Sequence, residues 1–230
     1  ALAVGLAADN MKLSTVGYRP AMVTINGEYM GMHNIRSKVN GAYISQNFDI
    51  SEDAFDMVEH GDYAEVGNLT AYNYLLEVLS KDLSIESNFN EVKELINIEN
   101  YADFVIMQVF LVNGSINHNT MAWKPKENGK WQWILVDLDR GFYNEGFNIE
   151  WFYEKGNLLL DRMITNEGFK NYFIKRFADH LFTSFSDDRI SNIITHYKEV
   201  IEKEMPRHIA RWQGTTSDYG NALPSYQKWL

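Results

Sequence analysis

The chain has 230 residues, a length that suits one domain or a domain with a small appended lobe. Its hydrophobic fraction of 45% and its charged fraction of 23% are ordinary for a globular protein with a large core. The net charge is −10, and no run of Lys or Arg forms a basic stripe. Because nucleic acids and anionic membrane surfaces attract basic side chains, we expect neither as a partner.

The sequence predicts no membrane span and no signal peptide. No segment approaches the roughly 20 consecutive apolar residues that a spanning helix requires. Residues 1–6 are apolar, but the run is short and carries no basic region before it. Cysteine is absent, which excludes disulfides and thiolate chemistry and leaves the compartment open. The chain starts and ends abruptly, as a domain truncated at both ends would.

The first predicted element is a β-hairpin. Residues 21–25 and 29–35 read as strands, and Asn26-Gly27 stands between them. An Asn-Gly pair accepts the positive φ angles of a tight two-residue turn. Pro20 has no backbone N–H to donate to a sheet, so it marks the beginning of the first strand.

Helices and polar loops are predicted from about Gly41 onward. The pattern predicts one helix over residues 69–79 and another over residues 100–112. The second is hydrophobic around nearly its whole circumference, which is typical of a buried helix. It leads into a polar loop over residues 113–120 that is rich in asparagine.

Residues 121–123 and 131–136 read as a second pair of strands, joined by a turn-like segment. After Asp139 we expect mostly helix, because apolar side chains keep helical spacing in two further stretches. The two stretches are Phe169, Tyr172, Phe173, Phe177 and Leu181, and then Ile190, Ile193, Ile194, Tyr197 and Ile201.

Two short hairpins followed by many helices predict an α+β fold. The chain contains no internal repeat, no low-complexity segment and no flexible linker that would divide it. We therefore expect one domain over residues 1–230, with a hairpin-bearing part at 1–45 and a mainly helical part at 46–230.

The strongest chemical signal is the pair Asp137 and Asp139, which follows the buried-looking strand at 131–136. If the strand continues, alternation directs both carboxylates to the same side. Two like charges in partial burial are costly unless a cation neutralises them, and Mg²⁺ favours carboxylate oxygens. The alternative is that one aspartate caps a turn and the other pairs with an arginine: Arg140, Arg162 or Arg176.

The asparagine-rich loop is the second candidate site. It leaves a buried helix and enters a strand, a position from which side chains can reach a cleft. Asn119 offers a neutral oxygen ligand for a metal, and His118 offers a contact for phosphate. The alternative is a polar loop whose asparagines satisfy their own turns.

Several motifs in combination resemble those of the CotH family. The hairpin sequence NGEYMG at residues 26–31, followed by Arg36, is similar to the NGEYxG hairpin and arginine of CotH-type proteins. Residues 131–142 resemble the family's WxWxxxDxDxGF segment. Further similar stretches are residues 18–20, 101–104, 166–169 and 208–212, with Asn113 and Asn119.

The resemblance implies a distant relative of protein kinases, with a small β-hairpin lobe remnant followed by a mainly helical lobe. It implies that ATP and Mg²⁺ serve the transfer of phosphate to a protein hydroxyl. Asp137 then matches the first metal ligand, Asp139 the second, and Asn119 the amide ligand. Family members are known from spore coats and from secreted bacterial proteins, so the resemblance implies a coat or cell-surface location and partner.

Two departures from the family pattern bear on activity. The loop reads Asn-Gly-Ser at 113–115 where the family has Asn-x-Asp, and Ser115 cannot act as the proton-accepting carboxylate. Ser37 replaces an acidic residue after the hairpin, while Arg36 and Lys38 are candidates for binding phosphate. The sequence therefore predicts either a protein kinase or a pseudokinase that still binds nucleotide.

Two other classes of function stay open. Ser115 and Ser37 favour a non-catalytic scaffold of a spore coat or cell surface. The aromatic content suggests a carbohydrate-binding module, with Trp123 and Trp212 as candidates for stacking on a sugar. The sequence has no phosphate-binding glycine loop followed by Lys and Ser or Thr, which excludes a P-loop enzyme.

Overall fold

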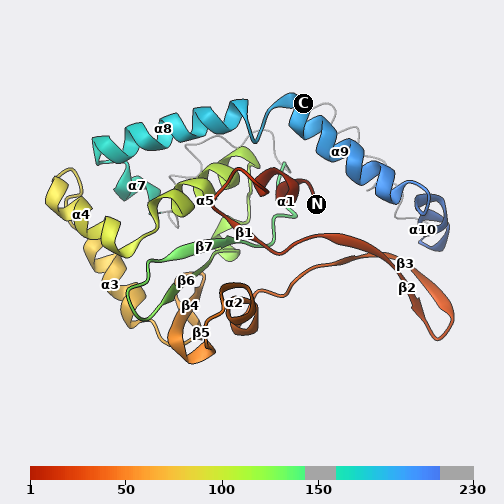
Figure 1. The fold of residues 1–230 in the computed structure, drawn as a ribbon, viewed down its shortest axis with the longest axis horizontal. Coiled ribbons are helices and arrows are strands. Elements are labelled where there is room, and N and C mark those ends of the chain that lie inside the picture. The colour runs from red at the N-terminus through yellow and green to blue at the C-terminus, as the bar shows by residue number, and fades with distance from the viewer. Residues whose placement is uncertain (143–158, 213–230) are drawn as a thin grey trace.

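The computed structural model describes residues 1–142 and 159–212, which form a mixed α+β fold (Figure 1). The predicted α+β class is confirmed. The helical region predicted after Asp139 includes residues 143–158, which lie outside the described residues. Within the described ranges, no helix is both long enough and apolar enough to cross a membrane.

A five-stranded sheet lies at the centre of the fold. Its strands are β1 (Ser14–Thr15), β4 (Phe55–Glu59), β5 (Tyr63–Val66), β6 (Met121–Pro125) and β7 (Gln132–Leu135). Their order in the sheet is β1-β7-β6-β4-β5, with β1 parallel to β7 and the other neighbours antiparallel. The second predicted strand pair is confirmed as β6 and β7.

The sequence pattern does not predict β1, β4 or β5. β1 has only two residues, too few for a recognisable pattern. β4 is buried at four of its five positions, so no alternation of buried and exposed side chains marks it as a strand. β4 and β5 therefore add two strands to the pair predicted within this part of the chain.

Helix α5 (Ile98–Phe110) packs against the sheet and is buried along most of its length. This confirms the predicted buried helix. The side-chain amide of Asn100 donates to the carbonyl oxygen of Trp133 at 3.0 Å and accepts from the N–H of Trp133 at 2.6 Å. These two bonds fix α5 to β7, because they satisfy the strand backbone much as a neighbouring strand would.

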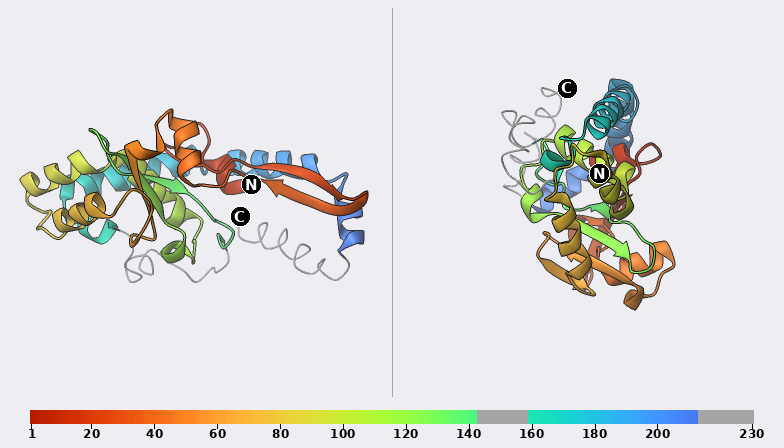
Figure 2. Two further views of the ribbon diagram at one scale, coloured as in Figure 1. Left: turned by 90° about the horizontal axis from the view of Figure 1, so that it is seen from below. Right: turned by 90° about the vertical axis from the view of Figure 1, so that its left-hand side faces the viewer.

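Helix α8 lies on the side of α5 away from the sheet, and α9 and α10 continue from it toward the far end of the hairpin (Figures 1 and 2). The helix predicted over residues 69–79 is confirmed as α3, and the two later stretches are confirmed as α8 and α9. The helices are α1 (Leu2–Ala7), α2 (Gly41–Phe48), α3 (Thr70–Leu79), α4 (Glu86–Leu95), α7 (Leu160–Met163), α8 (Glu167–Phe182), α9 (Asp187–Ile201) and α10 (Met205–Arg211).

The first predicted hairpin is confirmed as β2 (Arg19–Ile25) and β3 (Glu28–Ile35), which form a separate two-stranded sheet. Asn26 and Gly27 at its turn have φ angles of +51° and +84°, as an Asn-Gly pair predicts. The hairpin projects away from the five-stranded sheet, and both views place its far end beside α10 (Figures 1 and 2). Neither hydrophobic cluster of the described residues includes a hairpin residue.

The buried carboxylate of Asp103 joins α5 to α8. It accepts two hydrogen bonds from Arg176 at 2.5 and 2.7 Å and one from His180 Nε2 at 2.9 Å. It also accepts from the backbone N–H of Lys12 at 2.6 Å. Burial alone would raise the pKa of Asp103, but these hydrogen bonds together lower the pKa below its ordinary value.

We expect Asp103→Asn to lower the free energy of unfolding by about 3–5 kcal/mol at pH 7, because the partly buried Arg176 loses its buried counter-charge. The pKa of Asp103 is lower in the folded state than in the unfolded state. Its stabilisation is therefore present above the unfolded pKa and is lost as the pH falls through the folded pKa. Urea unfolding should show that the difference between parent and variant shrinks below about pH 4.

Asp179→Asn is the matched control for this prediction. Asp179 forms an exposed ion pair with Lys175 at 2.6 Å on the same helix, α8. Its loss should change the free energy of unfolding by less than about 0.5 kcal/mol. Equal effects of the two substitutions would contradict the role of Asp103.

Candidate functional site

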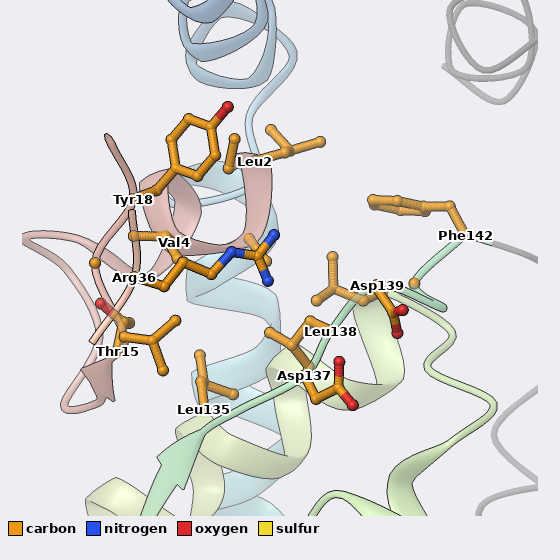
Figure 3. A pocket seen from close by; sticks show the side chains of 16 residues that line it. Leu2, Val4, Thr15, Tyr18, Arg36, Leu135, Asp137, Leu138, Asp139 and Phe142 are labelled. Carbon is orange, nitrogen blue, oxygen red and sulfur yellow. The ribbon is translucent and has the colours of Figure 1, made fainter. Parts of the chain in front are cut away.

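A cavity of ≈ 150 Å³ lies between α1, the base of the hairpin and the segment that follows β7. Arg36 lines it from the hairpin side, and Asp137 and Asp139 line it from the segment after β7 (Figure 3). Figure 3 shows the Arg36 side chain extending toward that segment. The structure thus brings three of the predicted site residues from distant parts of the chain to one cavity.

The two carboxylates do not reach the cavity by strand alternation. β7 ends at Leu135, and Asp137 has a left-handed φ angle of +48°. A left-handed residue ends an extended strand, so the strand does not continue to Asp139 and the condition for alignment by alternation is not met. The backbone after β7 instead sets their direction, and Figure 3 shows both carboxylates projecting to the same side of the segment.

Both carboxylates are exposed, whereas the sequence analysis expects partial burial. Exposed carboxylates are hydrated, so burial does not by itself demand a neutralising cation. Neither Asp137 nor Asp139 forms an ion pair within residues 1–142 and 159–212. Arg176, one of the alternative partners, pairs with Asp103. The two carboxylates are therefore accessible to a ligand.

Asn119 is fixed beside Asp137 by both N–H groups of its amide. Nδ2 donates to the Oγ of Ser115 at 3.0 Å and to the backbone carbonyl of Asp137 at 3.2 Å. Because a backbone carbonyl can only accept, this contact determines which end of the amide is nitrogen. Within the described residues, Oδ1 of Asn119 has no hydrogen-bond donor, so this oxygen is available to a ligand.

Ser115 is buried and supports Asn119 rather than facing a substrate. Its Oγ donates to Oδ1 of Asn113 at 3.0 Å and accepts from Asn119. Asn113 in turn donates to Oε1 of Gln108 on α5 at 2.8 Å. A chain of hydrogen bonds therefore runs from α5 through Ser115 and Asn119 to the backbone of Asp137.

The alternative reading of the loop holds for one asparagine and not for the other. Oδ1 of Asn113 accepts from the backbone N–H of Ser115 at 3.2 Å, so Asn113 does satisfy its own turn. Asn119 instead reaches across to Asp137, 18 residues away in the chain.

His118 and Lys38 lie outside the cavity that Arg36 lines. His118 is exposed and lines an adjoining cavity of ≈ 220 Å³ together with Glu59, Asn119 and Asp137. Asp137 therefore borders both cavities. Lys38 is exposed and lines neither of the two.

The backbone around the site is strained. Val112 and Phe142 have left-handed φ angles of +51° and +59°, conformations that cost a β-branched or bulky residue about 1–3 kcal/mol each. The N–H of Phe142 donates to the carbonyl of Leu111 at 2.5 Å, so the two strained residues lie on paired segments. Strain of this kind persists where surrounding contacts fix the backbone, and it is typical of functional sites.

One wall of the cavity is apolar, and no sequence pattern predicts it. Leu2 and Val4 on α1 and Leu111 at the end of α5 line it, together with Leu138 and Phe142 (Figure 3). Leu138 and Phe142 belong to the motif segment at residues 131–142, and the packing of α1 beside the end of β7 brings the other three residues to them. Their apolar surfaces would suit a ligand that is not entirely charged.

The residues present fit a magnesium ion that is shared with a phosphate ligand. Within residues 1–142 and 159–212, no group of three or more His, Cys, Asp or Glu side chains is arranged to hold a metal. Mg²⁺ that is bound together with phosphates needs only one or two protein carboxylates. Asp137 and Asp139 would supply the two carboxylates, and Oδ1 of Asn119 would supply a neutral oxygen. These residues do not fit a metal that is held by protein side chains alone.

The fold and the site define an α+β protein in which a buried helix, an asparagine loop and a strand pair lead to two accessible carboxylates. A family model described as CotH kinase protein matches residues 1–230, the whole chain. The chain therefore belongs to the CotH family, as its hairpin motif and its residues 131–142 predict. No curated protein matches the chain.

The position of Asn119 can be tested with Asn119→Asp, which replaces the donating nitrogen with an oxygen. At pH 7 this oxygen would face the carbonyl of Asp137 without a proton between them. We expect a loss of about 1–3 kcal/mol in the free energy of unfolding, measured with urea. Asn128→Asp, in the exposed turn between β6 and β7, is the control and should change this energy by less than about 0.5 kcal/mol. Equal stability of the two variants would contradict the described contacts.

Proposed function

We propose that the chain binds Mg²⁺ and ATP in this cavity and acts as a weak kinase-like phosphotransferase toward a protein hydroxyl. The observation that carries the proposal is the cavity, which Arg36 lines together with Asp137 and Asp139. A cation for phosphate oxygens and carboxylates for a metal are the groups that phosphoryl transfer requires, because this reaction depends mostly on positioning and charge neutralisation.

The order of the elements supports a kinase-like arrangement. A buried helix, α5, leads into the loop with Asn119, then into the β6–β7 strand pair, and then to Asp137. Protein kinases place a catalytic loop with a metal-binding asparagine before the strand pair that leads to a metal-binding aspartate. Membership of the CotH kinase protein family agrees with this reading.

Each polar residue has a separate role in the proposal. Asp137, Asp139 and Oδ1 of Asn119 would hold Mg²⁺, which neutralises the negative charge of the phosphates when it is bound. Arg36 contacts phosphate oxygens with its guanidinium N–H groups. Ser115 keeps Asn119 oriented through the hydrogen bond at 3.0 Å.

Transfer is expected to be slow because Ser115 cannot accept a proton from the attacking hydroxyl. A positioned general base contributes typically about 10²- to 10⁴-fold to rate. The buried contact of Ser115 with Oδ1 of Asn113 also means that Ser115→Asp would place a carboxylate against another oxygen. We therefore expect that this substitution alone does not restore fast transfer.

The proposed protein partner is a component of a spore coat or cell surface, and the proposed location is the same. Both rest on the family to which the chain belongs. A non-catalytic scaffold is the second candidate, and the buried position of Ser115 favours it. Binding of Mg²⁺ and ATP separates the two candidates, because a pure scaffold needs no nucleotide.

Thermal unfolding with and without Mg²⁺–ATP tests the nucleotide site. At about 100 times the dissociation constant, the ligand should add about 2.7 kcal/mol to the free energy of unfolding, or roughly 5–10 °C in Tm. We expect this shift in the parent chain and its loss in Asp137→Asn. Asp62→Asn, in the exposed turn between β4 and β5, should keep the shift. If the parent chain shows no Mg²⁺-dependent shift, the scaffold becomes the better proposal.

The phosphate contact is tested by comparing Arg36→Ala with Lys38→Ala. Arg36 lines the cavity and Lys38 does not. Loss of a charged hydrogen bond should raise the dissociation constant for Mg²⁺–ATP about tenfold in Arg36→Ala. Lys38→Ala should change it by less than about twofold. Adenosine, which has no phosphate, should bind all three proteins equally, and an equal loss of adenosine affinity would contradict the assigned role.

A further inference from the structure

Helix α10 binds the backbone of the hairpin directly, although the two are separated by more than 170 residues in the chain. Two side chains of the helix, and the side chain of Trp212 directly after it, contact main-chain groups of β3. His208 Nδ1 accepts from Met32 N–H at 3.0 Å, Arg211 Nε donates to Tyr29 O at 2.9 Å, and Trp212 Nε1 donates to Met30 O at 3.2 Å. We refer to His208, Arg211 and Trp212 as the hairpin clamp.

Gly31 makes this contact possible. It has a φ angle of +95° and lies where the hairpin register shifts. A Cβ at Gly31 would lie 2.5 Å from Trp212 Nε1 and 2.8 Å from His208 Nδ1. Gly27, at the tip, also has a positive φ angle, but a Cβ there would meet nothing within 4 Å. The last glycine of the NGEYMG motif therefore leaves room for the clamp.

Within residues 1–142 and 159–212, the hairpin packs mostly against α10, where Arg207 also lies 3.8 Å over the Tyr29 ring. A two-stranded hairpin alone is marginally stable at best in water. Met22 and Ile25 on β2 are 64% and 55% exposed, and no hairpin residue belongs to a hydrophobic cluster of the described chain. Polar bonds to α10 are thus a main determinant of where the hairpin lies.

The base of the hairpin forms one wall of the proposed nucleotide site. Residues 16–18 precede β2 and Arg36 follows β3, and all of them line the cavity. The N–H of Ser37 donates to the carbonyl of Val16 at 2.8 Å, which joins the two sides of the base. Tyr18 also packs edge-on against Tyr197 of α9, with ring centroids 5.1 Å apart. A change in the direction of the hairpin would therefore move Arg36.

We infer that the hairpin clamp sets the affinity of the nucleotide site by fixing the hairpin and, through it, Arg36. This inference rests on the proposed function and adds a means by which the site is controlled. His208, Arg211 and Trp212 are positioning residues, because they lie outside the cavity and act through β3. A partner that binds α10 would, by the same contacts, change how tightly the site holds phosphate.

The test compares Gly31→Ala and His208→Ala with Gly27→Ala as the matched control. Two quantities are measured in the whole chain: the dissociation constant for Mg²⁺–ATP, by calorimetry, and amide hydrogen exchange at Ser37. The first two variants should raise the dissociation constant about three- to tenfold and speed exchange at Ser37. Gly27→Ala introduces similar backbone strain without touching α10, so it should leave both quantities within about twofold.

A double-mutant cycle separates positioning from general loosening of the fold. If the clamp acts through Arg36, Gly31→Ala should weaken binding in the parent chain and have no further effect in Arg36→Ala. Additive losses, or an unchanged dissociation constant in Gly31→Ala and His208→Ala, would overturn the inference. If the parent chain binds no Mg²⁺–ATP, the proposed function fails, and the clamp is then judged by exchange alone. Unchanged exchange at Ser37 in both variants would show that α10 does not fix the hairpin base.

Discussion

Helix α5 carries two buried polar side chains, Asn100 and Asp103, and each must find hydrogen-bond partners on other elements. These bonds determine how the rest of the structure is arranged around α5. Asp103 is stable in the core only because Arg176, His180 and the N–H of Lys12 donate to it. Asn100, one turn earlier, bonds to the carbonyl of Lys12 at 2.8 Å and to both backbone groups of Trp133. One helix thereby fixes α8, the segment that leads into β1, and the strand β7.

Both walls of the candidate site depend on the hydrogen bonds that Asn100 and Asp103 make. The carboxylate wall follows β7, and the hydrogen-bond chain from Gln108 to Asn119 ties it again to α5. The opposite wall follows β1, whose position beside β7 depends on the anchored Lys12. Arg36 follows β3, the strand to which the clamp residues of α10 and Trp212 bind. The side with the two carboxylates is thus tied to the core, and the side with Arg36 is joined to the hairpin, which contacts α10.

Local chemistry made some features predictable and others not. Asn26-Gly27 predicts the hairpin because the turn is decided within two residues, and the apolar run at 100–112 predicts a buried helix. The local sequence does not predict β4, because the burial of this strand depends on neighbours far along the chain. The pair Asp137 and Asp139 is recognisable as a motif, but its exposure and the left-handed backbone at Asp137 are not, since both result from how the chain leaves β7. The sequence does not predict the hairpin clamp for a similar reason. Helical spacing places His208 and Trp212 on one face, but only the fold brings that face to β3.

The most direct test of the nucleotide site is a crystal structure of the whole chain with Mg²⁺ and a non-hydrolysable ATP analogue. We expect phosphate oxygens in contact with Arg36. We also expect a metal ion bound by a carboxylate oxygen of Asp137 and by Oδ1 of Asn119, at about 2.0–2.1 Å. A nucleotide bound elsewhere on the molecule, or a metal ion without Asp137 among its ligands, would contradict the proposed nucleotide site.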